Sequence, residues 1–186
     1  KYTVPSLSVE DGRTIASILQ QRLNALNDLA LTLKHIHWNV TGPHFIAVHE
    51  MIDPQVDAVR AMVDQIAERI ATLGVAPVGT PGALVQDRSW DDYSIGRAGA
   101  IEHLGALDEV YVGVVTDHRE AAAATEDLDT VTNDLLVGHL HELELFHWFV
   151  RAHLENAGGE ISTADAEGER ASAEAAGAAA QEAETV

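Results

Sequence analysis

The chain has 186 residues, enough for one well-buried domain and too few for two of ordinary size. Its formal net charge of −19 comes from 30 acidic residues against 11 lysines and arginines, and cysteine is absent. Disulfides and thiolate metal sites are therefore excluded, and any metal ion must be held by histidine and carboxylate. The sequence has no run of 18 apolar residues and no secretory signal layout at its start, so we expect a soluble cytoplasmic protein.

The acidic character is unusual for a chain of this size, and the only lysines are Lys1 and Lys34. A lysine-poor, acidic surface is typical of proteins from halophiles, because high salt screens the self-repulsion that would otherwise loosen the fold. The same charge would also serve the cavity of a shell by attracting cations inward. We therefore predict a high-salt cytoplasm and keep the second interpretation beside it.

Apolar periodicity predicts two long helices in the first half of the chain. The first runs over residues 11–40, with Asp11 as its N-cap, and Gly42-Pro43 ends it. The second runs over residues 46–73 and closes at a glycine in the left-handed conformation. Residues 75–90 carry two prolines and two glycines, which predicts a crossover loop with room for one short helical turn.

The second half of the chain predicts two more helices. One spans residues 89–124, with a Ser-x-x-Asp capping box at its start, and the other spans 134–155 after a turn at 126–132. The expected fold is an all-α, ferritin-like four-helix bundle with a long crossover connection between helices 2 and 3, formed by residues 1–156. Residues 157–186 form an acidic tail rich in Ala, Glu and Gly, which we expect to bury no core and to be mobile or marginally helical.

One face of the second helix carries metal-ligand residue types. At 100° per residue, one stripe about 100° wide collects His49, Asp53, Asp57, Asp64 and Glu68, while the opposite stripe is apolar. An amphipathic helix whose acidic face meets water explains this pattern without any metal. His37 lies on the apolar face of the preceding helix, where it is either a hydrogen-bonded core residue or a ligand.

Distance limits which of these residues share an ion. At 1.5 Å per residue, His49 lies about 22 Å from Asp64 and about 28 Å from Glu68 along the helix. A metal–ligand bond spans only roughly 2 Å, so one chain cannot close the site alone. Two antiparallel copies related by a two-fold axis would bring the histidine end of one helix to the acidic end of the other.

The segment HWNVTGPHFIAVHE at residues 37–50, followed by Asp53 and by DQIAERI at 64–70, resembles the Dps family of ferritin-like miniferritins. The similarity runs over residues 10–155. It implies a hollow dodecamer that oxidises Fe(II), typically with hydrogen peroxide, and stores the ferric product. It also implies that Trp38 lies beside the iron, although simple packing explains this residue equally well. The implied ferroxidase centre combines His37, His49 and Asp53 of one subunit with Asp64 and Glu68 of its two-fold mate.

Further acidic residues gain candidate roles from the resemblance. Asp129 and Asp134 lie where family members line the three-fold pores through which iron enters, and His139 would change that lining. A solvated acidic turn that caps a helix explains the same residues. Glu50 and Asp57 would face the cavity and seed the mineral, or serve solubility alone.

The last predicted helix is rich in histidine. Glu144-x-x-His147 has the spacing of a di-iron site inside a bundle, but such a site needs a second Glu-x-x-His motif, which this sequence lacks. We therefore expect the histidines of this helix to be surface or interface residues.

Two alternatives to ferroxidase activity stay open. The first is a nucleoid protein that protects DNA by binding it, which requires a basic arm or patch. The N-terminal segment KYTVPSLSVEDGR holds two positive charges and the C-terminal tail is acidic, so DNA binding is not expected. The second is an inert shell whose metal site is degenerate.

Overall fold

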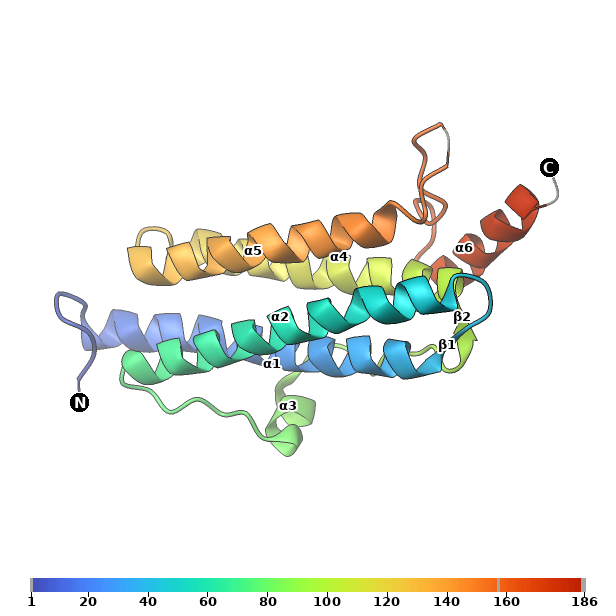
Figure 1. Cartoon of the computed structure of the whole chain (residues 1–186). Coiled ribbons are helices and arrows are strands. Elements are labelled where there is room, and N and C mark those ends of the chain that lie inside the picture. The colour runs from blue at the N-terminus through green and yellow to red at the C-terminus, as the bar shows by residue number, and fades with distance from the viewer. Residues whose placement is uncertain (1, 157, 185–186) are drawn as a thin grey trace. The chain divides into compact units, whose positions relative to one another are not determined.

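The protein is a helical bundle, seen in a computed structural model that describes residues 2–156 and 158–184. Figure 1 labels its elements: α1 (Val9–Asn39), β1 (Val40–Thr41), α2 (Phe45–Thr72), α3 (Pro81–Asp87), β2 (Ala98–Gly99), α4 (Ala100–Thr125), α5 (Thr130–Arg151) and α6 (Glu169–Glu184). The predicted all-α bundle with a long connection between its second and third long helices is confirmed. None of the described helices is long and apolar enough to cross a membrane.

The described residues divide into two compact units, and each unit contains a stretch of all four long helices. Unit 1 comprises residues 2–31, 57–90 and 114–142, and unit 2 comprises the rest. Each unit has its own apolar core. Fully buried side chains in unit 1 are Ile15, Leu19, Leu23, Leu26, Leu29, Ile66, Ile70 and Leu73. Those in unit 2 include Leu33, Ile36, Ile52, Leu104, Leu107 and Tyr111.

Helix α1 begins earlier than the sequence pattern predicts. Its N-cap is Ser8, whose hydroxyl oxygen accepts the Asp11 backbone N–H at 3.0 Å and donates to the Asp11 carboxylate at 2.6 Å. The assignment of Asp11 as N-cap is therefore wrong, because serine three residues upstream satisfies the free backbone donor.

The third long helix, α4, begins at Ala100 and not at Ser89. The residues before it are extended, because partners in unit 2 hold their backbone away from helical geometry. Thr41 Oγ1 donates to Ala98 O at 3.0 Å, and β1 pairs with β2 in parallel. His35 Nε2 lies 2.9 Å from Ile95 O. Long-range pairing of this kind overrides the weak local capping signal.

The fourth long helix, α5, begins at Thr130, four residues before the predicted start. Asp129 caps it, since its carboxylate accepts the Thr132 backbone N–H at 3.0 Å and also binds the Thr132 hydroxyl. The helix ends at Arg151, and residues 152–154 form a turn.

The C-terminal segment contains a sixth helix that packs on α4 within unit 2. Ser172, Ala173 and Ala176 are buried, and Ser172 Oγ donates to Glu109 Oε1 at 3.0 Å. The approach is close because Gly105 has no side chain: a Cβ there would lie 2.4 Å from Ser172 O. The expectation that this segment buries no core is therefore wrong. Small residues pack here where large apolar ones are absent.

Candidate metal centre at the two ends of α2

His37 and His49 form a stacked pair in unit 2. The turn between α1 and α2, with Gly42 at φ 79° and His44 at φ 65°, returns the chain so that the two rings stack at 3.6 Å between centroids. His37 Nδ1 lies 2.9 Å from His49 O, and His49 Nδ1 lies 2.9 Å from His37 O. A carbonyl oxygen only accepts hydrogen bonds, so each Nδ1 carries the hydrogen and each Nε2 keeps its lone pair.

This reciprocal arrangement is what a metal-binding histidine requires of its surroundings. A carbonyl that binds one ring nitrogen fixes the tautomer and orients the other nitrogen for an ion. His37 is 8% exposed and His49 is half-buried, so the stacked edge is accessible at one side. The interpretation of His37 as a hydrogen-bonded core residue is confirmed, and its role as a ligand stays a prediction.

Asp53 lies one helical turn after His49, and its carboxylate already has a cation. Lys34 Nζ donates to Asp53 Oδ1 at 2.7 Å, and His37 Nδ1 lies 3.4 Å from the same oxygen. The Lys34 hydrogen bond lowers the pKa of Asp53, and charge interactions with His37 and His49 act in the same direction. An incoming metal ion therefore competes with the Lys34 ammonium for this carboxylate.

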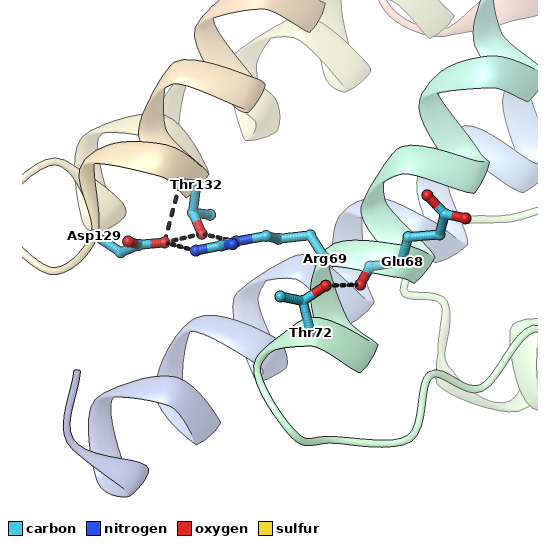
Figure 2. A network of polar contacts seen from close by, with 5 residues as sticks. All are labelled: Glu68, Arg69, Thr72, Asp129 and Thr132. Atoms are coloured by element: carbon cyan, nitrogen blue, oxygen red, sulfur yellow. Dashed lines mark hydrogen bonds and ion pairs between the residues drawn. The ribbon is translucent and has the colours of Figure 1, made fainter. Parts of the chain in front are cut away.

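Asp64 and Glu68 follow further along the same helix, in unit 1, and both are exposed. Figure 2 shows the Glu68 carboxylate pointing away from its neighbour Arg69, which turns instead to Asp129 and Thr132. The Thr72 hydroxyl donates a hydrogen bond to the Glu68 backbone oxygen at 2.8 Å, not to the Glu68 carboxylate. Among the described residues, neither carboxylate is seen in a hydrogen bond or an ion pair.

Within the part of the chain that the structure describes, no group of three or more His, Asp or Glu side chains is arranged to hold a metal ion. The stacked histidines with Asp53 offer three ligand groups, and the Lys34 ammonium occupies one of them. The other two carboxylates belong to a different stretch of α2. The predicted ligands therefore fall into two groups, which we call half-sites because the sequence predicts that each supplies part of one metal centre.

The remaining predicted metal residues lie apart from these half-sites. Glu50 and Asp57 are exposed. Asp129 makes a 2.5 Å ion pair with Arg69 in which both side chains are 12% exposed. Burial would raise the pKa of Asp129, but hydrogen bonds from Thr132 and Arg69 outweigh it and hold that pKa below the usual value. Asp134 is exposed and His139 is buried. The predicted pore residues thus differ: Asp129 is a capped, paired residue and Asp134 is open to solvent.

The expectation that the α5 histidines all lie at the surface is wrong for two of them. His139 is 4% exposed and His147 is 7% exposed, whereas His141 on α5 and His153 in the turn after it are exposed. His147 Nε2 lies 2.6 Å from Asp108 Oδ1, and Thr163 Oγ1 donates to the other oxygen of that carboxylate at 3.0 Å. His147 is thus a hydrogen-bonded core residue.

Sequence reasoning missed Lys34 and His118. Lys34 lies one turn before His37 on α1, and this i, i+3 spacing was the available signal. His118 is completely buried on α4 among positions that follow the apolar period, with Tyr111 two turns before it. Trp38, in contrast, is 72% exposed and therefore makes little packing contact. The Lys34 ammonium lies 5.8 Å from the centroid of its ring.

Comparison with known proteins places this geometry in a family. A family model described as a ferritin-like domain matches residues 16–158. The DNA protection during starvation protein of Mycolicibacterium smegmatis is 58% identical over 161 residues, covering 87% of this chain and 88% of that protein. The fine tangled pili major subunit of Haemophilus ducreyi is 52% identical over 160 residues, covering 86% and 85%. The solved structure of DpsA14 from Streptomyces coelicolor is similar with a TM-score of 0.87 and 64% identity, covering 88% and 97%.

The fold and the matched domain define a ferritin-like protein. Within that class, the chain belongs to the Dps family, as its sequence motifs predicted.

Proposed function

We propose that this protein is an iron-oxidising, iron-storing shell whose ferroxidase centres form between two copies of the chain. Each centre would take His37, His49 and Asp53 from one subunit and Asp64 and Glu68 from its two-fold mate. The observation that carries the proposal is the reciprocal pair of Nδ1–carbonyl hydrogen bonds, which leaves the Nε2 lone pairs of two stacked imidazoles available to an ion. Imidazole and carboxylate with open positions suit Fe(II).

The surroundings of the stacked histidines support a second copy of the chain as the partner. Large apolar side chains beside them are exposed: Trp38 by 72%, Ile46 by 57% and Phe45 by 39%. Exposed apolar side chains grouped in this way mark an interaction surface. We infer closed assembly into a dodecamer, for which sedimentation of the purified protein is the direct test.

The chemistry of such a centre is the oxidation of its substrate, iron. Two Fe(II) ions would each give one electron to hydrogen peroxide, which takes up two protons and leaves as two water molecules. The carboxylates would stabilise the Fe(III) product, because harder ions prefer oxygen ligands. Exposed Glu50 and Asp57 would then serve as nucleation points for the mineral.

Stopped-flow measurement of Fe(II) oxidation, with peroxide and with oxygen in separate runs, tests the proposal. His37→Ala with His49→Ala should slow the rapid phase by more than the roughly 10–100-fold that outer-shell changes cost in metal sites. His141→Ala, an exposed histidine on α5, is the matched control and should oxidise iron at the wild-type rate. Equal, rapid rates in all three proteins would exclude these two histidines as ligands, and a wild-type rate no faster than that of protein-free buffer would make an inert shell the better interpretation.

We also propose that iron enters past the acidic start of α5. Asp134 is the residue best suited to attract cations, while Asp129 is engaged by Arg69, and His139 adds a neutral group to the lining. Asp134→Asn should slow iron uptake most at low salt, because the attraction is screened as salt rises. Unchanged uptake at every salt concentration would remove this entry route.

DNA protection by direct binding is the second candidate function, since a relative carries that name. The net charge of −19 disfavours it, because phosphate binding needs cations that release counterions. We expect no mobility shift of duplex DNA at 150 mM salt or above. A shift that fades as salt rises would favour the nucleoid role.

The acidic composition supports a protein adapted to a high-salt cytoplasm. If repulsion among surface carboxylates limits stability, molar potassium chloride should raise the melting temperature of the assembly. Cell fractionation of the source organism would test the cytoplasmic location.

The division into a bundle domain at 1–156 and a tail at 157–186 likewise stays a proposal, which limited proteolysis would test.

A further inference from the structure

A second pair of histidines lies in unit 1, away from the half-sites of α2. His118 on α4 is completely buried and His139 on α5 is 4% exposed, with their ring centroids 5.6 Å apart and tilted by 42°. Neither ring nitrogen of His118, nor Nδ1 of His139, has a hydrogen-bond partner among the described residues. A buried polar atom without a partner costs about 1–3 kcal/mol, so three such atoms on two neighbouring rings point to a ligand.

The tautomer of His139 is fixed. Its Nε2 lies 2.8 Å from Gln65 Oε1, an oxygen that only accepts, so Nε2 carries the hydrogen. His139 Nδ1 is then an unprotonated nitrogen with a lone pair inside the protein. This is the same outer-shell device that orients metal-binding histidines elsewhere.

Both imidazoles are neutral at neutral pH. Burial lowers the pKa of His139 to about 4. Burial, with smaller contributions from His139 and Arg22, lowers the pKa of His118 to about 3. Neutral imidazole is the form that binds a metal ion. The nearby guanidinium of Arg22 is offset by Asp117, whose carboxylate lies 3.3 Å from it.

The spacing of the rings suits a shared ion. A metal–nitrogen bond of about 2.0–2.1 Å puts the ion roughly 3 Å from each ring centroid, so two imidazoles at a tetrahedral angle have centroids roughly 5 to 6 Å apart. The observed 5.6 Å falls in that range.

A pocket gives an approach from solvent to His139, one member of the pair. It has a volume of about 490 Å³ and lies between α2 and α5 within unit 1, where Gln65 and His139 line it. Asp134 and Glu142, which are exposed, line the same pocket. Carboxylates at the approach attract cations, and imidazole behind them selects among those ions.

We propose that His118 and His139 form a second metal site, which binds one divalent first-row transition ion such as Zn²⁺, Co²⁺ or Fe²⁺ per chain. Gln65 acts as a positioning residue that orients His139. Two neutral nitrogens discriminate against Mg²⁺ and Ca²⁺, which prefer oxygen ligands. The site is independent of the proposed ferroxidase centre.

Anaerobic titration with Co²⁺ tests the proposal in an assembled parent protein that carries His37→Ala and His49→Ala. We expect this parent to bind one Co²⁺ per chain with the visible absorption of nitrogen ligation, and excess Mg²⁺ to leave that band unchanged. Adding His118→Gln with His139→Gln should abolish the band. Adding His141→Gln, the exposed control on α5, should preserve it. Because the parent lacks the ferroxidase histidines, failure of either proposal is distinguishable from failure of the other.

Gln65→Leu keeps the test decisive if the buried substitutions prevent folding. Gln65 is exposed, and losing its acceptor should weaken Co²⁺ binding by roughly 10–100-fold while the fold is retained. The proposal is overturned by a parent without the cobalt band, by a band that survives loss of both histidines, or by a band indifferent to Gln65→Leu. A water molecule shared by the two rings would produce the first of these results.

Discussion

Each of the two histidine pairs consists of two neighbouring imidazole rings, but their surroundings are opposite. His37 and His49 stack at 3.6 Å at an accessible edge, where two backbone carbonyls fix both tautomers and a carboxylate lies beside them. His118 and His139 are buried, one amide fixes the tautomer of His139, and among the described residues no carboxylate is hydrogen-bonded to either ring. The first pair suits an ion that must be oxidised and released, because carboxylates from two chains complete it. The second pair suits an ion that remains bound to the protein.

The comparison also shows how burial separates two uses of one residue type. An imidazole that keeps contact with solvent can exchange ligands. A fully buried one is kept neutral by desolvation, and its unsatisfied nitrogens cost stability until something binds them. The difference predicts distinct responses to acid, to helix displacement and to charge removal.

The largest expected effect is acid destabilisation by the buried pair. Burial puts the pKa values of His118 and His139 at about 3 and about 4, below the ordinary 6.5 of the unfolded chain. Below pH 6.5 the unfolded state therefore binds protons that the folded state refuses, and stability falls as the pH falls. At pH 5 the loss should be about 2 kcal/mol for each histidine.

Urea unfolding of metal-free protein at pH 7 and pH 5, at one protein concentration, measures this loss. His118→Gln with His139→Gln should remove most of the difference between the two pH values. His141→Gln should leave the difference unchanged. An equal pH effect in all three proteins would show that acid sensitivity lies elsewhere.

A smaller effect should appear in unit 2 and leave unit 1 unchanged. Gly105→Ala would place a Cβ 2.4 Å from Ser172 O and 2.8 Å from the Ala176 side chain. Overpacking of this kind costs about 1–3 kcal/mol and should displace α6. Hydrogen exchange should therefore quicken at residues 169–184 in unit 2, while the acid response of the buried pair in unit 1 persists.

Gly113→Ala is the matched control, since it lies in the same helix with no atom within 4 Å of a new Cβ. It should be neutral or stabilise the protein by roughly 0.5–1 kcal/mol. If both glycine variants loosened α6 equally, the close packing of α6 on α4 would not be what holds that helix.

The smallest effect concerns the charge beside the open pair. Lys34→Met removes the ammonium that lies 2.7 Å from Asp53 and lets the pKa of that carboxyl rise toward its ordinary value. Because the ammonium and an incoming cation compete for the same carboxylate, half-saturation with Fe(II) should need less iron in this variant than in the wild type. Lys34→Arg, which keeps the charge, should behave as wild type in the same assay.

Much of this fold follows from local pattern. The buried positions of α2, such as Ile52, Val59 and Ile66, lie on the stripe that the helical period predicts. The starts of α4 and α5 were not predictable in this way. Ala100 begins a helix because β1 and His35 hold the preceding residues extended, and Thr130 begins one because Asp129 is anchored by Arg69 from α2. The contacts of β1, His35 and Arg69 are tertiary and are not encoded locally, whereas the Asp129 cap on Thr132 is a local signal that the prediction overlooked.

The candidate site, like the fold, has features that the local sequence predicts and features that depend on tertiary contacts. Residue type and spacing were enough to predict His37, His49 and Asp53 as one group, and the structure brings those three together. The reciprocal carbonyl bonds depend on the turn at Gly42 to His44, and the Lys34 ion pair depends on α1 and α2 lying together in unit 2. The buried His118–His139 pair joins residues 21 positions apart on two helices, so no short motif could indicate it.

Complementation between two inactive variants tests the central claim most directly. One variant carries His37→Ala with His49→Ala, and the other carries Asp64→Asn with Glu68→Gln. Asp64 and Glu68 are exposed and His49 is half-buried, whereas His37 is buried, so sedimentation of each variant checks its assembly. We expect both variants to assemble and to lack rapid Fe(II) oxidation. In a mixed dimer, one site receives both lesions and the other receives the intact half-site from each chain.

Random pairing makes roughly half of the dimers mixed, so shells refolded from an equal mixture should regain roughly a quarter of the wild-type rapid oxidation. Mass spectrometry of the refolded shells would establish that the two chains have mixed. Recovery near a quarter is the result that two-chain ferroxidase centres predict. Mixed shells without any rapid oxidation would contradict them, because a site built from one chain cannot be restored by the other.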